Sequence, residues 1–264
     1  MSDTSSAPIL LSESRGHIRI LTINRPERSN AISPELSEAL IEAFVDANAD
    51  PEVRVVILTA VGDRAFCGGA DLKARAAEDA AGKPFQPLLS RVQRYLYEVV
   101  LETFKPTIAA LNGSAVAGGC ELALACDMRV AAEQALMGLP EAKRGKGAHF
   151  ANIVLPRLIP PAIAFEMLYL GEYIGMEDAR RWGLVNRIVP KGEALNEAIR
   201  IAEVICENAP VTIRRMKETA VRANGLPVAT AMRLNEGISP YQSEDRVEGV
   251  RAYVEKRKPV WKGR

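Results

Sequence analysis

The hydrophobic and polar positions change period from one segment to the next in the first part of the chain. Residues 17–26, HIRILTINRP, alternate apolar and polar side chains and predict a β-strand. Residues 53–62, VRVVILTAVG, form a nearly continuous β-branched run, which predicts a strand buried on both faces. Between them, residues 33–50 open with Ser33 as an N-cap followed by proline and predict a helix. The apolar positions on one face of that helix are Leu36, Leu40, Ile41 and Phe44.

An order of strand, glycine-rich turn and helix then repeats along the chain. Residues 62–72, GDRAFCGGADL, are typical of a glycine-rich loop, and a helical pattern covers about 88–104. The strand-like run PTIAALNG at 106–113 again leads into a glycine-rich turn and a helix. Residues 127–141 predict two short strands with a short connection. This order predicts an α/β fold with mostly parallel strands.

Beyond about residue 158 the strand pattern ends, and only helices are predicted. The helix-like segments are 160–171, 176–185, 193–209, 210–223, 228–237 and 243–258. We therefore predict a flexible N-terminal tail over 1–8, a core that carries the active site over 9–195, and a helical C-terminal region over 196–264. That region packs either on its own core or on another subunit.

Composition narrows the class of protein. The 264 residues are 48% hydrophobic and 25% charged, which is typical of a soluble globular protein with a sizeable core. The net charge of +1 predicts neither a nucleic-acid partner nor an anionic membrane surface. The polar start MSDTSSAP is not typical of a secretory signal, and no apolar run reaches roughly 20 residues, so we expect neither a signal peptide nor a membrane helix. The four cysteines lack paired metal spacing, so we expect reduced thiols in a cytoplasmic protein.

Two glycine pairs predict close backbone approach to a ligand. Gly68 and Gly69 stand in FCGGAD, and Gly118 and Gly119 stand in AVAGGCE at an expected helix start. Unpaired N–H groups there suit a developing negative oxygen, so two such donors would form an oxyanion hole. The alternative, that both pairs serve tight turns or helix–sheet packing, stays open.

Two glutamates add candidate acid–base chemistry. Glu121 lies in the first turn of the expected helix, and Glu141 follows the strand-like ALMGLP. Two carboxylates in one partly dry cleft do not both ionise easily, so one favours the acid and the other the base. That division suits the addition of water to a double bond. Alternatively, Glu121 complements the helix dipole and Glu141 is a surface loop residue.

Known phosphate, dinucleotide and nucleophile motifs are absent. RGKG lacks a following GK[ST], no GxGxxG follows a strand, and Ser114 is not in a GxSxG turn. Only two histidines, His17 and His149, occur, so we expect no histidine-based metal site.

The central block resembles a known family. AFCGGADL at 65–72 and the segment 105–145 are similar to the signature region of the enoyl-CoA hydratase/isomerase (crotonase) family, and the segments 24–33 and 243–264 match it too. The resemblance covers about residues 10–264. It implies a spiral of ββα units, with a helical C-terminal region that builds trimers or hexamers. It also implies a hydro-lyase of fatty acid metabolism that adds water reversibly to a 2-enoyl-CoA, with CoA as part of the substrate and no permanently bound cofactor.

The resemblance also assigns residues. It implies that the N–H groups of Ala70 and Gly118 hold the thioester carbonyl, that Glu121 mainly activates water, and that Glu141 protonates the α carbon. Tyr253 and Lys256 match positions that close over CoA, in some members from a neighbouring subunit; alternatively they belong to a solvated helix end. The implied substrate or CoA contacts are Arg25, Arg28, Cys67, Gly68, Gly69, Asp71, Tyr253 and Lys256.

One departure from the family pattern concerns the acyl pocket. Where the family usually has a run resembling Pro-Gly-Ala-Gly-Gly, this chain has RGKGAHFANIVLPRL at 144–158. His149 and Phe150 are therefore possible pocket residues, and His149 is a possible proton carrier. Alternatively, His149 packs at a helix start and contacts nothing. An isomerase or racemase of the same family, a thioester hydrolase and a non-catalytic acyl-CoA-binding subunit remain alternative functions.

Overall fold

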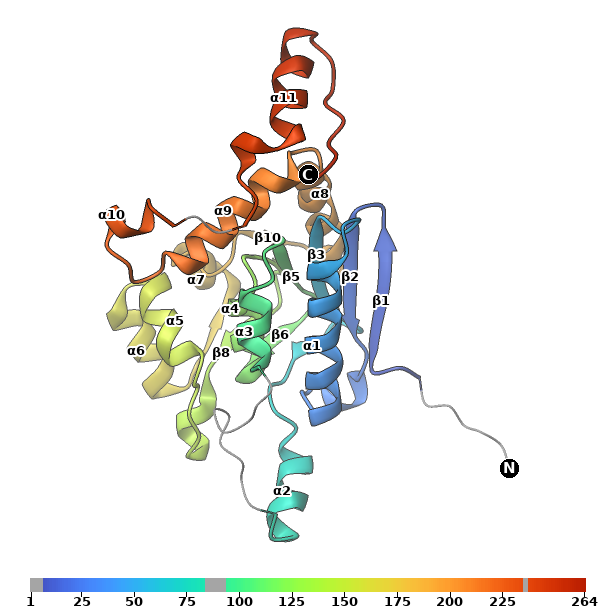
Figure 1. The fold of residues 1–264 in the computed structure, drawn as a ribbon. Coiled ribbons are helices and arrows are strands. Elements are labelled where there is room, and N and C mark those ends of the chain that lie inside the picture. The colour runs from blue at the N-terminus through green and yellow to red at the C-terminus, as the bar shows by residue number, and fades with distance from the viewer. Residues whose placement is uncertain (1–6, 84–93, 235–236) are drawn as a thin grey trace.

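The structure is a computed structural model that describes residues 7–83, 94–234 and 237–264. It combines two β-sheets with helices on both sides of the larger one (Figure 1). Of the predicted N-terminal tail, residues 1–6 lie outside the described residues. Among the described residues, no helix has both the length and the apolar character needed to span a membrane.

The larger sheet has six strands, and only its first pair is antiparallel. The strands are, in spatial order, β1 (Leu10–Arg15), β2 (Ile18–Ile23), β3 (Val55–Ala60), β5 (Thr107–Leu111), β7 (Met128–Ala132) and β10 (Arg187–Val189). All six residues of β3 are buried, as the continuous apolar run at 53–62 predicts. The parallel pairing of β2, β3, β5 and β7 confirms the predicted α/β class.

The smaller sheet has four strands, three of which directly follow a strand of the larger sheet along the chain. Its strands are β4 (Ala65–Cys67), β6 (Ser114–Val116), β8 (Leu136–Gly138) and β9 (Tyr173–Gly175). The chain runs from β3 to β4, from β5 to β6 and from β7 to β8, so each unit places one strand in each sheet. Helices α2 (Leu72–Ala80) and α4 (Gly118–Ala125) complete the first two units.

Three sequence predictions were wrong about strands. The loop expected at 62–72 contains β4, and the glycine-rich turn expected after 106–113 contains β6. Strands β9 and β10 lie beyond residue 158, where only helices were predicted. Each of these strands has three residues, which is too short to show an alternating pattern. The sheet neighbours, rather than the local sequence, hold them extended.

Most of the remaining helices pack against one hydrophobic core that includes side chains of both sheets. They are α1 (Pro34–Ala49), α3 (Leu96–Leu101), α5 (Ala151–Leu158), α6 (Pro161–Leu170) and α7 (Met176–Arg181). The α1 helix begins as predicted, since the Ser33 side chain accepts the Leu36 N–H. The helix expected over 88–104 is α3, while 84–93 lies outside the described residues.

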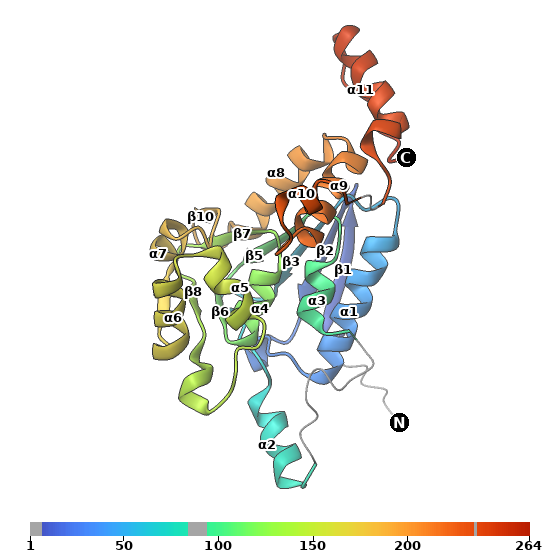
Figure 2. The ribbon, with the colours of Figure 1, turned by 60° about the vertical axis from the view of Figure 1, so that its left-hand side comes forward.

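The C-terminal part is helical. Helix α8 (Ala194–Cys206) continues through the predicted boundary at residue 195 and covers the other face of the six-stranded sheet. Helices α9 (Pro210–Arg222), α10 (Val228–Ala231) and α11 (Glu244–Val254) follow. Figures 1 and 2 show α11 projecting from the end of the molecule opposite α2, with α4 between them.

Candidate active site

Helix α4 starts at a sharply turned backbone directly after β6. Ala117 has φ 53° and ψ −128°, an uncommon conformation for a residue with a Cβ, and its N–H donates to the Gly138 carbonyl at 2.8 Å. A Cβ on Gly119 would overlap the carbonyl oxygen of Cys67. Glycine is therefore needed at that position, because the first turn of α4 packs directly on the backbone of β4.

The amide groups of Ala70 and Gly118 come from separate loops and lie near each other. A Cβ built on Gly118 would lie 3.8 Å from the Ala70 nitrogen, and one on Gly69 would lie 3.0 Å from the Gly118 nitrogen. Ile32 bonds the Gly69 carbonyl at 2.8 Å and the Asp71 N–H at 3.1 Å, so the Ala70 N–H faces away from Ile32. Among the described residues, no acceptor takes the N–H of Ala70 or Gly118. Two unpaired donors thus lie side by side.

The predicted CoA contacts Arg25 and Asp71 bond to each other. The Arg25 guanidinium lies 3.2 Å from the Asp71 carboxylate and also donates to the Ala31 carbonyl. Asp71 caps α2 by accepting the Ala74 N–H at 3.2 Å. Burial acts to raise the pKa of Asp71, but the Ala74 N–H and the Arg25 charge outweigh it and hold that pKa below its ordinary value. This pair fixes the loop that carries the Ala70 amide, while Arg28 is exposed at the end of the neighbouring turn.

Glu121 is buried in the first turn of α4, with 4% of its surface exposed. Its Oε1 accepts the N–H groups of Phe150 and Ala151, each at 2.9 Å, at the start of α5. Burial raises the pKa of Glu121 to about 7; the charge of Glu141 adds to this, and the hydrogen bonds from Ala151, Phe150 and Tyr97 oppose it. A carboxyl group with this pKa exchanges a proton readily near neutral pH.

Glu141 lies in the 3₁₀ helix η3 (Pro140–Arg144) and is also buried, with 9% of its surface exposed. Burial raises its pKa, against the opposing effects of a hydrogen bond from its own backbone N–H and the charges of Arg144 and Lys146. Its Oε2 is buried and has no hydrogen-bond partner among the described residues. A buried carboxylate oxygen is costly to leave unpaired, so this oxygen is available to a ligand.

Two tyrosines join this site, and neither was singled out from the sequence. Tyr97 on α3 is 5% exposed and its hydroxyl donates to the Gly118 carbonyl at 2.9 Å. Its ring centroid lies 4.8 Å from that of Tyr95 and 5.5 Å from that of Phe150. In the sequence, RYLYEVV reads only as apolar helix positions, and nothing in its spacing indicates a contact 21 residues away.

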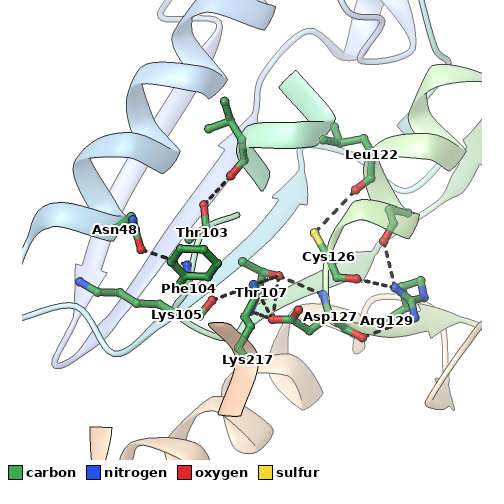
Figure 3. Close-up of polar contacts among 12 residues, drawn as sticks. Asn48, Thr103, Phe104, Lys105, Thr107, Leu122, Cys126, Asp127, Arg129 and Lys217 are labelled. Carbon is green, nitrogen blue, oxygen red and sulfur yellow. Dashed lines mark hydrogen bonds and ion pairs between the residues drawn. The ribbon is translucent and has the colours of Figure 1, made fainter. Parts of the chain in front are cut away.

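The far end of α4 is held by buried cations, as Figure 3 shows. The Arg129 guanidinium donates to the Cys126 carbonyl at 2.7 Å and to the Leu184 carbonyl. Lys217 on α9 pairs with the Asp127 carboxylate at 2.8 Å. Cations near a helix C-terminus complement its dipole, so these contacts fix the helix that carries Glu121.

Several predicted residues lie elsewhere or act differently from the prediction. Tyr253 is 86% exposed on α11, and Lys256 follows that helix, so within one chain neither lies with the two glutamates. His149 is exposed, while Phe150 reaches Glu121 through its backbone N–H. For Cys67 the predicted contact is through the backbone, and it stays a prediction; burial raises the pKa of the Cys67 thiol to about 12, so the side chain stays neutral.

Two further features of the described residues concern ligands. A groove of about 730 Å³ lies against α11 and the segment 255–262, and neither Glu121 nor Glu141 lines it. Within 7–83, 94–234 and 237–264, no three histidine, cysteine, aspartate or glutamate side chains come together as metal ligands would.

Comparisons with known proteins identify similar chains. The family model described as enoyl-CoA hydratase/isomerase matches residues 13–264. A protein of Salmonella paratyphi A named carnitinyl-CoA dehydratase is 41% identical over 256 residues, which cover 94% of this chain and 96% of that protein. An enoyl-CoA hydratase structure from Mycobacterium tuberculosis H37Rv has a TM-score of 0.87 at 37% identity, covering 98% of this chain and 100% of that one. The Bacillus anthracis enoyl-CoA hydratase structure has a TM-score of 0.87 at 34% identity, with 97% and 100% covered.

Proposed function

This chain belongs to the enoyl-CoA hydratase/isomerase family, and on that premise we propose that it adds water reversibly to a 2-enoyl-CoA to give a 3-hydroxyacyl-CoA. It is an enzyme of the hydro-lyase type. The observation that carries the finer proposal is a pair of buried glutamates that interact electrostatically, one of them in the helical turn that begins with the unpaired Gly118 amide. Glu121 has its pKa raised to about 7, and Glu141 has a buried oxygen without a partner among the described residues.

The amides of Ala70 and Gly118 would bind the thioester carbonyl oxygen. In hydration, water adds to C3 and negative charge moves onto that oxygen, so both N–H groups donate more strongly to the enolate-like state than to the substrate. Removal of one such donor in other enzymes costs about 3–4 kcal/mol of transition-state stabilisation. The N–H of Gly118 suits this role because it stands at the N-terminus of α4, where the helix dipole is positive.

The two glutamates would move the protons. In the hydration direction Glu121 takes a proton from water as the oxygen attacks C3, and Glu141 gives a proton to C2. Dehydration reverses both steps. The Phe150 and Ala151 amides hold Oε1 of Glu121 in place, and the Glu141 oxygen that lacks a partner among the described residues would bind water or substrate.

For the CoA part, the loop of Arg25 and Arg28 and the backbone of residues 67–69 would line the binding site, with Asp71 as the fixed partner of Arg25. Tyr253 and Lys256 would reach CoA only from a neighbouring subunit, in a homotrimer or a hexamer. Exposed apolar side chains on α11 support such an interface: Val247, Val250, Tyr253 and Val254. We propose CoA as part of the substrate, no permanently bound cofactor and a cytoplasmic location.

The test is hydration of a 2-enoyl-CoA, followed by loss of the conjugated thioester absorbance. Glu121→Gln and Glu141→Gln should each lower kcat by about 100-fold to 10,000-fold, because each removes one proton-transfer group. Glu166→Gln, on the exposed face of α6, is the matched control and should keep the wild-type rate. Wild-type rates in both folded active-site variants would refute the assignment.

The same reaction in ¹⁸O-labelled water separates hydration from rival activities. Incorporation of labelled oxygen at C3 supports the hydratase, whereas a moved double bond without label indicates an isomerase. Release of free CoA thiol indicates a hydrolase, and binding without turnover indicates a non-catalytic subunit. The substrate panel should vary chain length, branching and aromatic groups. It should include carnitinyl-CoA, because the Salmonella relatives carry that name.

A further inference from the structure

We propose that Tyr97 is a positioning residue for this reaction, which holds Glu121 and the first turn of α4 in one fixed arrangement. The inference rests on the proposed function, because it gives Tyr97 a role toward a proposed catalytic group. Tyr97 lies on α3, 24 residues before Glu121 in the chain, and no sequence motif connects the two.

The Tyr97 hydroxyl occupies the space that a side chain on Gly118 would need. It donates to the Gly118 carbonyl at 2.9 Å, and a Cβ on Gly118 would lie 2.5 Å from the hydroxyl oxygen. The residue whose N–H is a proposed oxyanion donor therefore packs against this hydroxyl. As the first residue of α4, Gly118 also offers its carbonyl to the Leu122 N–H, in the i to i+4 pattern of a helix. The hydroxyl can thus leave this carbonyl without stranding it.

The ring of Tyr97 is locked between elements that surround Glu121. It makes an edge contact with Tyr95 at 4.8 Å and a tilted contact with Phe150 at 5.5 Å. Phe150 also donates its backbone N–H to Glu121. One buried ring therefore links α3, the first turn of α4 and the start of α5. A side chain fixed by packing in this way holds its hydroxyl in one place.

The charged and titratable groups around Tyr97 keep its hydroxyl protonated, and the hydroxyl in turn affects the pKa of Glu121. Burial raises the pKa of Tyr97 well above its ordinary value, and nearby Glu121, Tyr95 and Cys67 add to this, so the hydroxyl remains a donor. When Glu121 is ionised, the single Tyr97 hydroxyl proton can turn from the Gly118 carbonyl to this carboxylate. That hydrogen bond favours the ionised form of Glu121, against burial and the charge of Glu141. Tyr97 thereby helps to keep Glu121 ionised, which is the form that can accept a proton from water.

The experiment removes only the hydroxyl, with Tyr97→Phe. Hydration of a 2-enoyl-CoA should show kcat lowered by about 10-fold to 100-fold, the usual effect of losing a hydrogen bond to a charged group, with KM little changed. The acid limb of the pH profile of kcat should move to higher pH, because ionised Glu121 loses a donor. Tyr169→Phe, at an exposed position of α6, is the matched control and should leave both quantities unchanged.

A wild-type kcat and pH profile in Tyr97→Phe, while Glu121→Gln is inactive, would overturn the proposal. A lower kcat with an unmoved acid limb would also overturn it, since a merely structural role predicts that result. If the wild-type protein hydrates no 2-enoyl-CoA, the proposed function fails separately. The role of Tyr97 is then decided by ¹³C NMR titration of the glutamate carboxyls, with Glu121→Gln identifying the Glu121 signal. The pKa of Glu121 should rise in Tyr97→Phe, and an unchanged pKa would overturn the inference.

Discussion

Replacing Glu121 by glutamine should stabilise the folded protein at pH 8 while removing a proposed catalytic group. Burial is the main reason that the pKa of Glu121 rises to about 7, with the charge of Glu141 adding to it. Glutamine is neutral at every pH and has nearly the same shape. Its amide oxygen can accept the same Phe150 and Ala151 N–H groups that now bond Oε1 at 2.9 Å. The substitution therefore removes the cost of a buried charge and keeps the hydrogen bonds.

The size and sign follow from proton binding. A carboxyl group with a higher pKa in the folded than in the unfolded state binds protons more tightly when folded. The free energy of unfolding of the wild-type protein should thus fall as pH rises from 4.5, the ordinary value, to about 7, and then level off. At about 1.4 kcal/mol per pH unit, the difference between these pKa values corresponds to about 3 kcal/mol at pH 8. The free energy of unfolding of the glutamine variant should not show this fall over this pH range, because glutamine does not titrate.

Urea unfolding followed by circular dichroism from pH 5 to pH 8 measures the effect. Protein concentration is held fixed, since subunit association adds to apparent stability. Relative to the wild type, Glu121→Gln should be about 1 kcal/mol more stable at pH 5 and about 3 kcal/mol more stable at pH 8. Glu166→Gln controls for loss of a surface charge. A difference that is the same at every pH, or a variant that is less stable at pH 8, would refute the reasoning.

Two other substitutions test the loops and the helix that build the site. Gly69→Ala should destabilise the protein by about 1–3 kcal/mol and lower kcat, because φ is +85° there and the new Cβ would lie 2.8 Å from that of Ala117; thermal unfolding and hydration assays check this. Arg129→Met should cost about 1–3 kcal/mol for each carbonyl that loses its donor, as at Cys126 and Leu184, measured by urea unfolding. Wild-type stability in either variant would contradict the corresponding contact.

Local sequence predicted those parts of the molecule whose conformation depends on near neighbours. The run at 53–62 is a strand buried on both faces, and Ser33 caps α1. The contiguous block at 105–145 carries Gly118, Glu121 and Glu141, so spacing and resemblance were enough to single them out. The short strands β4, β6, β9 and β10 were not predicted, because three residues cannot show a period.

The surroundings of Glu121 were decided only by the tertiary structure. The Phe150 amide is 29 residues away in the chain, yet it donates to Glu121, while the adjacent His149 is exposed. The Tyr97 hydroxyl reaches Gly118 from α3, and Arg25 pairs with Asp71 across 46 residues. Hydrophobic periodicity reports which face of an element is buried. It does not report which other element covers that face, and the covering elements supply the hydrogen bonds, the burial and hence the pKa of a buried acid.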